Sequence, residues 1–471
     1  MSGNTPDNVV SKHAWREIDR AGLPKRAAAD RVADFLEIYG PYDEATAREQ
    51  AARCVQCPEP SCVEGCPLNN RIPEWLALTA EGQFLEAAAL LHSTNNLPEI
   101  CSRTCPTDRL CEGHCILDGK AEPVNIGAVE RFLNEYAFVH GAVDASTASP
   151  NGLRVAVVGS GPCGLTCADE LAQRGYAVTI YASRSLPGGL LVNGMSAFKI
   201  DRSVVQRRID VLKKKGVAFQ LGVTLGEDVT LGKLREDYHA VFLSVGAPTA
   251  RPLHLPGEDL DGVVQALPFI MQQSTDCGHQ SPPANTVGKR VVVIGGGDTA
   301  MDCLRTAIRC QASDVLCVYR RDEASMPCGH TEHDEALEEH ARFLYQAAPV
   351  AVVGDEQGRV SGLRMLRTEL GAPGTDGRPK CNPIPGSEFE IPADQVILAL
   401  GFDPLSFPPS SDFADLETGD NGGLRVDDRH MTNVEGVFAG GSVVLGPSMV
   451  VNTVRDARQA VADIESFLRP G

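Results

Sequence analysis

The 471-residue chain is poor in aromatic and basic residues and has no long apolar run. Aromatic residues make up 5% of it, and 62 acidic residues outnumber 43 basic ones, for a formal net charge of −19 at pH 7. This deficit of positive charge disfavours nucleic acids and anionic membranes as partners, because both require basic patches. The chain contains no run of about eighteen apolar residues, which is the length needed to span a bilayer. Residues 1–26 lack the apolar core of a secretory signal. We therefore expect a cytoplasmic protein without membrane insertion.

Cysteine, in contrast, is abundant, with sixteen residues in the chain and eight of them between positions 54 and 115. In a cytoplasmic protein such cysteines indicate reduced thiols or metal ligands and not disulfides. The stretch CVQCPEPSCVEGCP has the short spacings and the final proline that are typical of loops around iron-sulfur clusters. Structural zinc is the main alternative, but zinc sites usually pair two CxxC units across a spacer. The eight cysteines are Cys54, Cys57, Cys62, Cys66, Cys101, Cys105, Cys111 and Cys115.

The chain is long enough for about three domains. Residues 1–150 have helical periodicity around the cysteines and end in a small, polar stretch, GAVDASTASPNG. Two segments then read as strand, glycine turn, helix and strand, one beginning near residue 154 and one at residue 289. We predict a helical domain over 1–150, a split nucleotide-binding domain over 151–288 and 395–471, and an inserted nucleotide-binding domain over 289–394.

The first glycine turn is GxGxxG, formed by Gly159, Gly161 and Gly164 between an apolar strand and a helix. In this context the first glycine makes the turn, the second admits a pyrophosphate and the third allows the helix and strand to pack closely. A dinucleotide is the expected ligand, and an ordinary βαβ turn is the alternative. The acidic residue that usually contacts the adenosine ribose is missing, because Ala182 stands at the end of the second strand.

The second turn predicts an NADPH site. Its residues are Gly295, Gly296, Gly297, Asp298, Thr299 and Ala300. The next strand ends in Arg320 and Arg321 in place of an acid. Guanidinium groups at this position favour a 2′-phosphate over the free ribose of NADH. A solvated strand end is the alternative interpretation of these two arginines.

Taken together, these motifs resemble the small (β) subunits of NADPH-dependent glutamate synthase over nearly the full chain. The matching stretches include CPLNNRIPEWLALTAEGQFLEAAAL, CPTDRLCEGHC, VNIGAVERF, GSGPCGLTCADEL, VIGGGDTAMDC and YRRDEASMP. The same architecture occurs in the N-terminal part of dihydropyrimidine dehydrogenase and in the larger subunit of the bifurcating transhydrogenase. The resemblance implies an α/β fold of the glutathione-reductase-like type, with two Rossmann-like nucleotide-binding domains after an N-terminal α-helical iron-sulfur domain.

The resemblance also implies two 4Fe-4S clusters with interleaved ligands. One set would be Cys54, Cys57, Cys62 and Cys115, and the other Cys66, Cys105, Cys111 and Glu130. Spacing alone would suggest two separate sets of four cysteines. Whether Cys101 or Glu130 completes the second cluster therefore stays open at this point.

The family places FAD in the split domain and NADPH in the inserted one. The residues expected at the FAD site are Gly159, Gly161, Gly164, Gly188, Gly189, Leu190, Gly246, Gly441 and Ser442. Ala182 and Ser442 stand where the family has acidic residues, so we expect FAD to bind at a weakened site. The stretch MPCGHTEH replaces a serine, two arginines and an acid. Cys328, His330 and His333 could ligate a metal there, but a polar loop explains them better because no fourth ligand is evident.

The resemblance implies an enzyme, an NADPH-dependent oxidoreductase that is the electron-input subunit of glutamate synthase. Electrons would pass from NADPH through FAD and the clusters to a large catalytic subunit that makes L-glutamate from L-glutamine and 2-oxoglutarate. A hetero-oligomer is therefore expected. The alternative is a paralogous electron-transfer, conducting or structural subunit of another redox complex. The flavin-site departures keep that alternative open.

Overall fold

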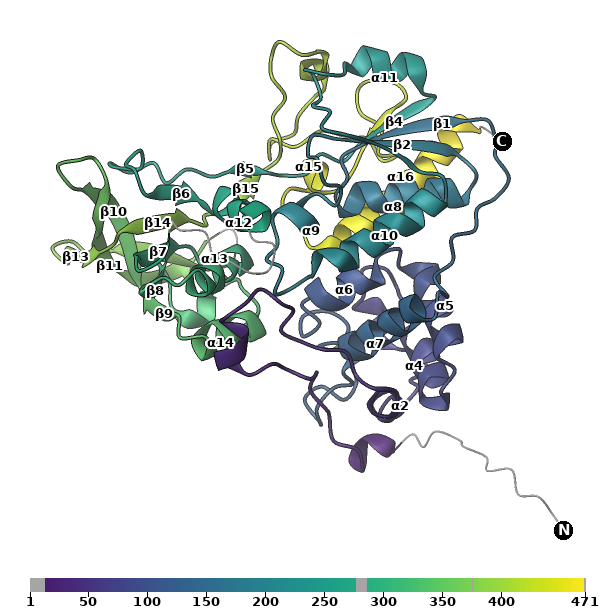
Figure 1. The fold of residues 1–471 in the computed structure, drawn as a ribbon, viewed down its shortest axis with the longest axis horizontal. Helices are drawn as coiled ribbons and strands as arrows, with labels where there is room; N and C mark the ends of the chain where they lie inside the picture. Colours follow the sequence, from purple (N-terminus) through teal and green to yellow (C-terminus); the bar gives the residue numbers. More distant parts are fainter. Residues whose placement is uncertain (1–12, 277–285, 375–376, 470–471) are drawn as a thin grey trace.

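The computed structural model describes residues 13–276, 286–374 and 377–469, and arranges them in three bodies (Figure 1). The N-terminal body is helical, the second contains a parallel sheet covered by helices, and the third contains a further parallel sheet. The chain passes from the second body to the third and back. Among the described residues, no helix is long and apolar enough to cross a membrane.

The N-terminal body consists of short helices connected by the cysteine loops. They are η1 (Ala14–Arg16), α1 (Ala28–Arg31), α2 (Glu44–Ala52), α3 (Ser61–Glu64), α4 (Ile72–Glu81), α5 (Phe84–Thr94), α6 (Pro98–Thr104) and α7 (Ile126–Val139). Helix α4 has a proline in its first turn and ends at Gly82, whose φ of 84° suits glycine. The core forms around the fully buried Trp75 and an edge-to-face pair, Phe84 and Phe132, with centroids 5.0 Å apart.

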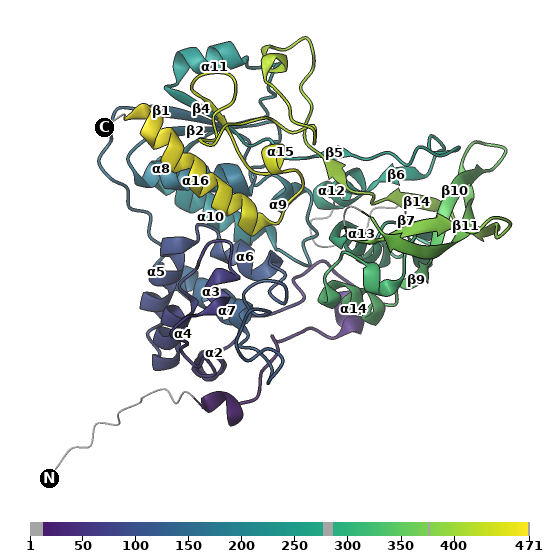
Figure 2. The same cartoon turned by 180° about the vertical axis from the view of Figure 1, so that it is seen from behind.

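The first sheet has five parallel strands in the order β16-β4-β1-β2-β3. These strands are β1 (Arg154–Val158), β2 (Ala177–Ala182), β3 (Ala218–Leu221), β4 (Ala240–Leu243) and β16 (Val437–Ala439). Three long helices cover one face, and Figure 2 shows α16 lying along α8. They are α8 (Pro162–Gln173), α10 (Arg202–Lys214) and α16 (Val450–Leu468). The other face is covered by α11 (Leu231–Asp237) and η3 (Asp412–Asp415), and the short helices α9 (Leu190–Asn193) and α15 (Ser442–Leu445) complete this body.

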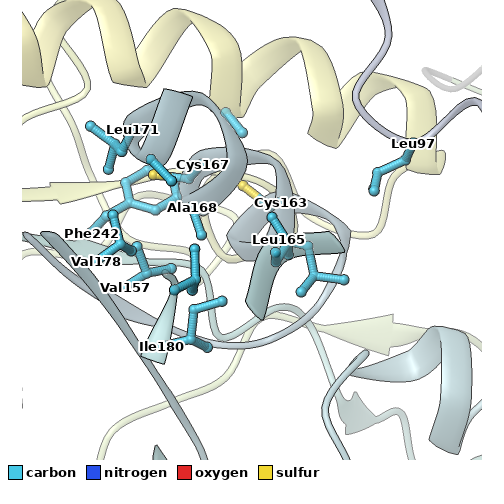
Figure 3. Close-up of a cluster of buried hydrophobic side chains, with 14 of the residues drawn as sticks. Leu97, Val157, Cys163, Leu165, Cys167, Ala168, Leu171, Val178, Ile180 and Phe242 are labelled. Atoms are coloured by element: carbon cyan, nitrogen blue, oxygen red, sulfur yellow. The ribbon is translucent and has the colours of Figure 1, made fainter. Parts of the chain in front are cut away.

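The core under these three helices includes residues of the N-terminal body. Leu97 and Ile100, in and next to α6, belong to the same buried cluster as Val157, Leu171 and Val178. Figure 3 shows Leu97 at the margin of this cluster. Because the cluster is continuous across the two bodies, their separation would expose apolar surface and cost free energy.

The second sheet is also parallel, in the order β6-β14-β7-β8-β9. Its strands are β6 (Val263–Gln265), β7 (Arg290–Ile294), β8 (Asp314–Tyr319), β9 (Arg342–Tyr345) and β14 (Gln395–Leu398). Helices α12 (Ala266–Asp276), α13 (Asp298–Arg309) and α14 (His330–Glu338) cover one face, and η2 (Glu323–Ser325) precedes α14. An antiparallel sheet covers the other, formed by β10 (Ala347–Gly354), β11 (Val360–Pro373), β12 (Pro379–Pro383) and β13 (Phe389–Pro392).

The predicted boundaries of the inserted domain, 288/289 and 394/395, need correction. Strand β6 precedes residue 289 and β14 follows residue 394, yet both pair within the second sheet. The glycine turn follows β7, which lies in the middle of this sheet and is not its first strand in the chain. The chain crosses between the bodies at the small antiparallel ribbon of β5 (Thr249–Ala250) and β15 (Phe402–Asp403). The inserted body therefore spans roughly the residues between these two strands, and β16 returns to the first sheet as expected.

Candidate cofactor sites

The eight clustered cysteines line two separate hollows in the N-terminal body. The first hollow is lined by Cys54, Cys57, Cys62 and Cys115 together with apolar side chains such as Ile116. Cys115 comes from the second half of the octet, so the hollow joins residues far apart in the sequence. This grouping matches the interleaved set that the family resemblance implies.

The second hollow is lined by Cys66, Cys105, Cys111 and Glu130, and also by Cys101. Helix α7 supplies Glu130, which is 8% exposed. Asn95 donates to its Oε1 at 3.2 Å, and the Cys101 thiol donates to Asn95 Oδ1 at 3.7 Å. Both candidates for the fourth ligand thus border the hollow, and the side-chain amide of Asn95 is hydrogen-bonded to both of them.

Burial is the largest cause of the raised pKa of most thiols that line the two hollows. It raises the pKa of the Cys54 and Cys66 thiols to about 11 and that of Cys62 to about 12. Burial also raises the pKa of the Glu130 carboxyl to about 8. Since ligands bind metals as anions, these groups would give up their protons only to a strongly positive centre. Soft sulfur donors around an apolar hollow fit an iron-sulfur cluster.

A single zinc ion fits less well. Sulfurs around one tetrahedral zinc lie about 4 Å apart, whereas a cubane takes thiolates from several separate faces. Within residues 13–276, 286–374 and 377–469, no three His, Cys, Asp or Glu side chains form a group that could hold one metal ion. The stretch around Cys328, which is among the described residues, therefore contains no such group of metal ligands. His333 Nε2 lies 2.7 Å from the Tyr345 hydroxyl, and Cys328 is 3% exposed.

Two glycines that sequence reasoning missed shape the cysteine loops. A Cβ on Gly113 would lie 1.9 Å from the carbonyl oxygen of Asp108, so only glycine lets the loop from Cys111 to Cys115 fold back on itself. A Cβ on Gly65 would lie 2.5 Å from the His114 ring, between the two halves of the octet. The spacing CEGHC contained this signal, because glycine between two ligands often marks a close approach.

The first glycine turn follows β1 at the carboxyl edge of the first sheet. Gly159 has φ of 111°, and its Cβ would lie 2.3 Å from Ser244 O; a Cβ on Gly164 would lie 1.9 Å from Gly159 O. Next to Gly161, in contrast, the space is open. No side chain caps the start of α8, so its first amides are available to a pyrophosphate. The turn therefore has the shape that a dinucleotide requires.

The remaining predicted FAD residues gather at the same edge. Gly188, Gly189 and Leu190 follow β2, Gly246 follows β4, and Gly441 and Ser442 follow β16. The Cβ of a residue in place of Gly189 would lie 2.7 Å from Gly161 Cα. Leu190 is 41% exposed, and Ser442 begins α15. At the ribose position Ala182 is buried and apolar, as the sequence indicated.

Asp456 is a carboxylate at this edge that sequence reasoning missed. Its Oδ2 accepts a hydrogen bond from the amide of Gly441. A Cβ on Gly440 would lie 2.8 Å from that oxygen. Its Oδ1 lies 3.4 Å from His430 Nε2, and this contact is the main reason why the pKa of His430 is raised. Asp456 thus fixes the turn that carries Ser442, which itself lacks a carboxylate.

The second glycine turn follows β7. Gly295 has φ of 143°, and its Cβ would lie 2.2 Å from Ala399 O, whereas the space beside Gly297 is open. No side chain caps α13, whose first residues are Asp298, Thr299 and Ala300. The turn is also in contact with the segment before α14. There Gly296 O accepts from Cys328 N at 3.2 Å, and Asp298 Oδ1 accepts from Gly329 N at 3.0 Å.

The two arginines after β8 have different environments. Arg321 is 7% exposed, and its Nε donates to Pro379 O at 2.7 Å, which ties it to the antiparallel sheet. Arg320 is exposed, and its guanidinium makes no hydrogen bond or ion pair with any described residue. Only Arg320 is therefore free to meet a phosphate, whereas Arg321 is occupied by the fold.

The body that contains the first glycine turn is called the flavin body below, and the body that contains the second is called the nucleotide body. The two bodies meet at α13. Lys199 Nζ lies 2.6 Å from Asp302 and 3.0 Å from Glu332. Burial would lower the pKa of Lys199, but these two carboxylates outweigh it and raise the pKa. Next to it, Phe198 packs its ring against the guanidinium groups of Arg305 and Arg309 at 4.8 and 4.0 Å. The relative position of the two glycine turns is therefore held by buried contacts.

Comparison with known proteins agrees with this arrangement. A family model described as dihydropyrimidine dehydrogenase domain II, 4Fe-4S cluster, matches residues 31–142. A second, described as pyridine nucleotide-disulphide oxidoreductase, matches residues 153–461. In the solved structure of Mycobacterium tuberculosis FprA in complex with NADPH, 84% of the chain aligns with 67% of this one, at a TM-score of 0.56 and 22% identity. That likeness shows the fold of the two nucleotide-binding bodies.

The relatives in sequence cover almost the whole chain. The glutamate synthase [NADPH] small chain of Azospirillum brasilense is 44% identical over 454 residues, which is 94% of each chain. UacF of Escherichia coli K12, which does not bear the glutamate synthase name, is 41% identical over 459 residues, 94% of this chain and 71% of its own. With its iron-sulfur body, its two nucleotide-binding bodies and these relatives, the chain belongs to the glutamate synthase small-chain family of iron-sulfur oxidoreductases.

Proposed function

We propose that the chain is the electron-input subunit of a glutamate synthase and draws its electrons from NADPH. A large catalytic subunit would use them to make L-glutamate from L-glutamine and 2-oxoglutarate. One combined observation carries this proposal. Two cysteine hollows and two glycine turns lie in bodies that pack against one another, and the chain is similar over nearly its full length to a glutamate synthase small chain. A cytoplasmic hetero-oligomer follows from the same proposal.

The residues fit three kinds of cofactor. The turn at Gly159 to Gly164 would hold FAD, and the turn at Gly295 to Ala300 with Arg320 would hold NADPH. Two 4Fe-4S clusters would fill the hollows, held by Cys54, Cys57, Cys62 and Cys115 and by Cys66, Cys105, Cys111 and Glu130. When bound, these cofactors supply hydride acceptance and one-electron transfer, and the protein supplies position and shielding from water.

The surroundings of the two hollows suggest an order. Val451, at the start of α16 in the flavin body, lines the second hollow. The first hollow is lined by Ile116, which is 48% exposed. The second hollow is therefore the one next to the flavin body, and the first is the one near the surface. An electron carrier in the first hollow would be the one placed to serve a partner subunit.

Glu130 is the better candidate than Cys101 for the fourth ligand of the second cluster. Helix α6 holds Cys101 at 2% exposure, and its thiol already donates to Asn95. A carboxylate whose pKa is raised by burial gains more from a nearby positive centre than one in water. Replacing Glu130 by Ala and, separately, Cys101 by Ala would show which change loses iron.

A second candidate function is electron transfer to another redox partner. The similarity to UacF supports it, because that protein shares 41% of the aligned residues and has a longer chain. The apolar Ala182 at the ribose position also departs from what FAD-binding proteins of this type have.

The test is to express the chain with a glutamate synthase large subunit under anaerobic conditions and to purify the complex. Iron, sulfide and released flavin are measured, and then glutamate formation from glutamine and 2-oxoglutarate with NADPH. Glutamate formation supports the proposal. Reduction of an artificial acceptor without glutamate formation would favour another partner, and a flavin-free protein with full iron would favour a conducting role.

A further inference from the structure

A direct connection runs from the cysteine loop to the second glycine turn. Arg109 lies between Cys105 and Cys111, two of the proposed ligands in the second hollow. Its Nη1 donates to Pro327 O at 3.2 Å and its Nη2 donates to Cys328 O at 2.7 Å, across the boundary between the iron-sulfur and nucleotide bodies. Figures 1 and 2 show the purple segment around α1, which belongs to the N-terminal body, beside α14 in both views.

The same short segment is what holds the glycine turn. The peptide after Pro327 places Cys328 N on Gly296 O, and the next places Gly329 N on the carboxylate of Asp298. Gly296 and Asp298 are the residues on either side of the open position at Gly297, where a pyrophosphate would approach. The segment 327–329 is thus held at one end by the cysteine loop and holds the nucleotide turn at the other.

We propose that Arg109 is a positioning residue for the nicotinamide nucleotide, and that it couples nucleotide binding to the cluster in the second hollow. The inference rests on the proposed binding of NADPH at the second glycine turn. Arg109 does not touch the nucleotide; it orders the segment that fixes Gly296 and Asp298. Because coupling between two sites is reciprocal, nucleotide binding must in turn alter the Cys105–Cys111 loop.

The connection does not depend on the side chains of the stretch that departs from the family pattern. The stretch MPCGHTEH departs from the family pattern and was open to a metal-binding interpretation. In the structure its main-chain groups make the connection, through the carbonyls of Pro327 and Cys328 and the amides of Cys328 and Gly329. Side-chain identity can vary at these positions without breaking the connection.

The experiment uses the anaerobically purified protein with its cofactors in four forms. They are the wild type, Arg109→Ala, Arg109→Lys and the control Arg71→Ala, in which an exposed arginine that pairs with Glu74 is removed from the same body. NADP⁺ binding is titrated by calorimetry. The paramagnetic resonance spectrum of the dithionite-reduced clusters is recorded with and without NADP⁺.

We expect Arg109→Ala to bind NADP⁺ roughly fivefold to tenfold more weakly, as the loss of hydrogen bonds from a charged donor implies. NADP⁺ should change the cluster spectrum of the wild type and of Arg71→Ala but not that of Arg109→Ala, and Arg109→Lys should restore part of the affinity. Unchanged affinity in Arg109→Ala, or a wild-type spectrum that ignores NADP⁺, would overturn the inference.

A second variant separates this inference from simple failure of the cysteine loop. Gly329 has φ of −62° and ψ of 143°, so proline can replace it and remove only the amide that reaches Asp298. Gly329→Pro should retain full iron and also bind NADP⁺ more weakly; wild-type affinity in this variant would contradict the inference. If the wild type itself binds no NADP⁺, it is the proposed function that fails.

Discussion

Glu339 is the buried carboxylate on which three arginines of two bodies converge. Arg31 of the N-terminal body donates from Nε to its Oε1 at 2.6 Å. Arg305 donates to Oε1 at 2.9 Å and Arg309 donates to Oε2 at 2.5 Å, both from α13. The side chain of Glu339 has no exposed surface, and Arg31 is 1% exposed. Replacing Glu339 by Gln would leave Arg309 facing a neutral amide, whereas Arg31 would keep Glu338, and Arg305 would keep Glu332 and Glu335.

The expected cost is about 3 to 5 kcal/mol, the usual penalty for removing one partner of a buried ion pair. The pKa of Glu339 gives a similar figure. Burial would raise this pKa, but hydrogen bonds from Arg309 and Arg305 outweigh burial and hold it at about 2. A carboxyl whose pKa is 4.5 in the unfolded chain and about 2 in the folded one contributes about 3 kcal/mol at neutral pH.

The direction in which stability changes with pH follows from the same two pKa values. The contribution is complete above about pH 4.5 and is lost as the pH falls toward 2, because the unfolded chain then binds a proton that the folded chain resists. Urea unfolding of the apoprotein, followed by circular dichroism through its first transition, should show the full loss in Glu339→Gln at pH 7.5. The difference from wild type should shrink at pH 4.

The matched control is Glu390→Gln. Glu390 pairs with Arg364 at 3.1 Å, but both side chains are more than half exposed. Such a pair contributes about 0 to 1 kcal/mol. If Glu339→Gln unfolds within about 1 kcal/mol of wild type, or if its loss does not depend on pH, the buried ion cluster does not hold the bodies together.

Three further results are expected. Cys57→Ser should lower the iron content from about eight to about four atoms per chain, as two four-iron clusters require, whereas stoichiometric zinc in the wild type would contradict the cluster assignment. Arg320→Ala should reduce the preference for NADPH over NADH by about one to two decades in affinity. Arg321→Ala should instead lower the stability of the fold with little effect on that preference. Equal binding of both nucleotides by the wild type would contradict the NADPH site. Ser442→Asp should slow the loss of FAD on gel filtration, and a wild type that binds no flavin at saturating FAD would show that the site is lost.

The elements around each glycine turn could be predicted from the sequence because their chemistry is local. Gly159 and Gly164 lie where a Cβ would meet backbone atoms of Ser244, just after β4, or of the same turn, and a strand and a helix flank them in the sequence. The alternation of apolar strand and helix carries the same information. The return to the first sheet was predicted near residue 395, but β14 begins there and pairs with β7, and the chain rejoins the first sheet only at β16.

The boundaries of the inserted body were not predictable in the same way. Strand β14 reads as a short apolar run, and nothing within it tells whether it pairs with β7 or with β4. Its partners depend on the β5 and β15 ribbon, which consists of two residues on each side. So short a pairing has no periodicity for a sequence pattern to detect.

Long-range polar contacts were also beyond the sequence. The distribution of the eight cysteines over two hollows depends on how the loop after α6 folds back, and Cys115 reaches Cys54 only through that fold. Arg31, Arg109 and Glu339 looked like ordinary charged residues, because burial and partners are set by the packing of bodies that are separated by hundreds of residues. Only the family resemblance indicated the interleaving in advance.

Helix α6 explains how the iron-sulfur and flavin bodies keep a fixed spacing. Ile100 on this helix, and Leu97 just before it, lie in the core of the flavin body. Glu99, with no exposed surface, accepts two hydrogen bonds from Arg208 of α10, at 2.7 and 2.8 Å. The helix then leads directly to Cys105 in the second hollow. Electron transfer slows steeply with the distance between two cofactors. One side of α6 belongs to the core of the flavin body, and its C-terminal end forms part of the second hollow. Core packing around α6 therefore sets the distance between the flavin site and the second hollow. A mutation that loosens this core, such as Leu97→Ala, would therefore alter electron transfer even though it touches no cofactor ligand.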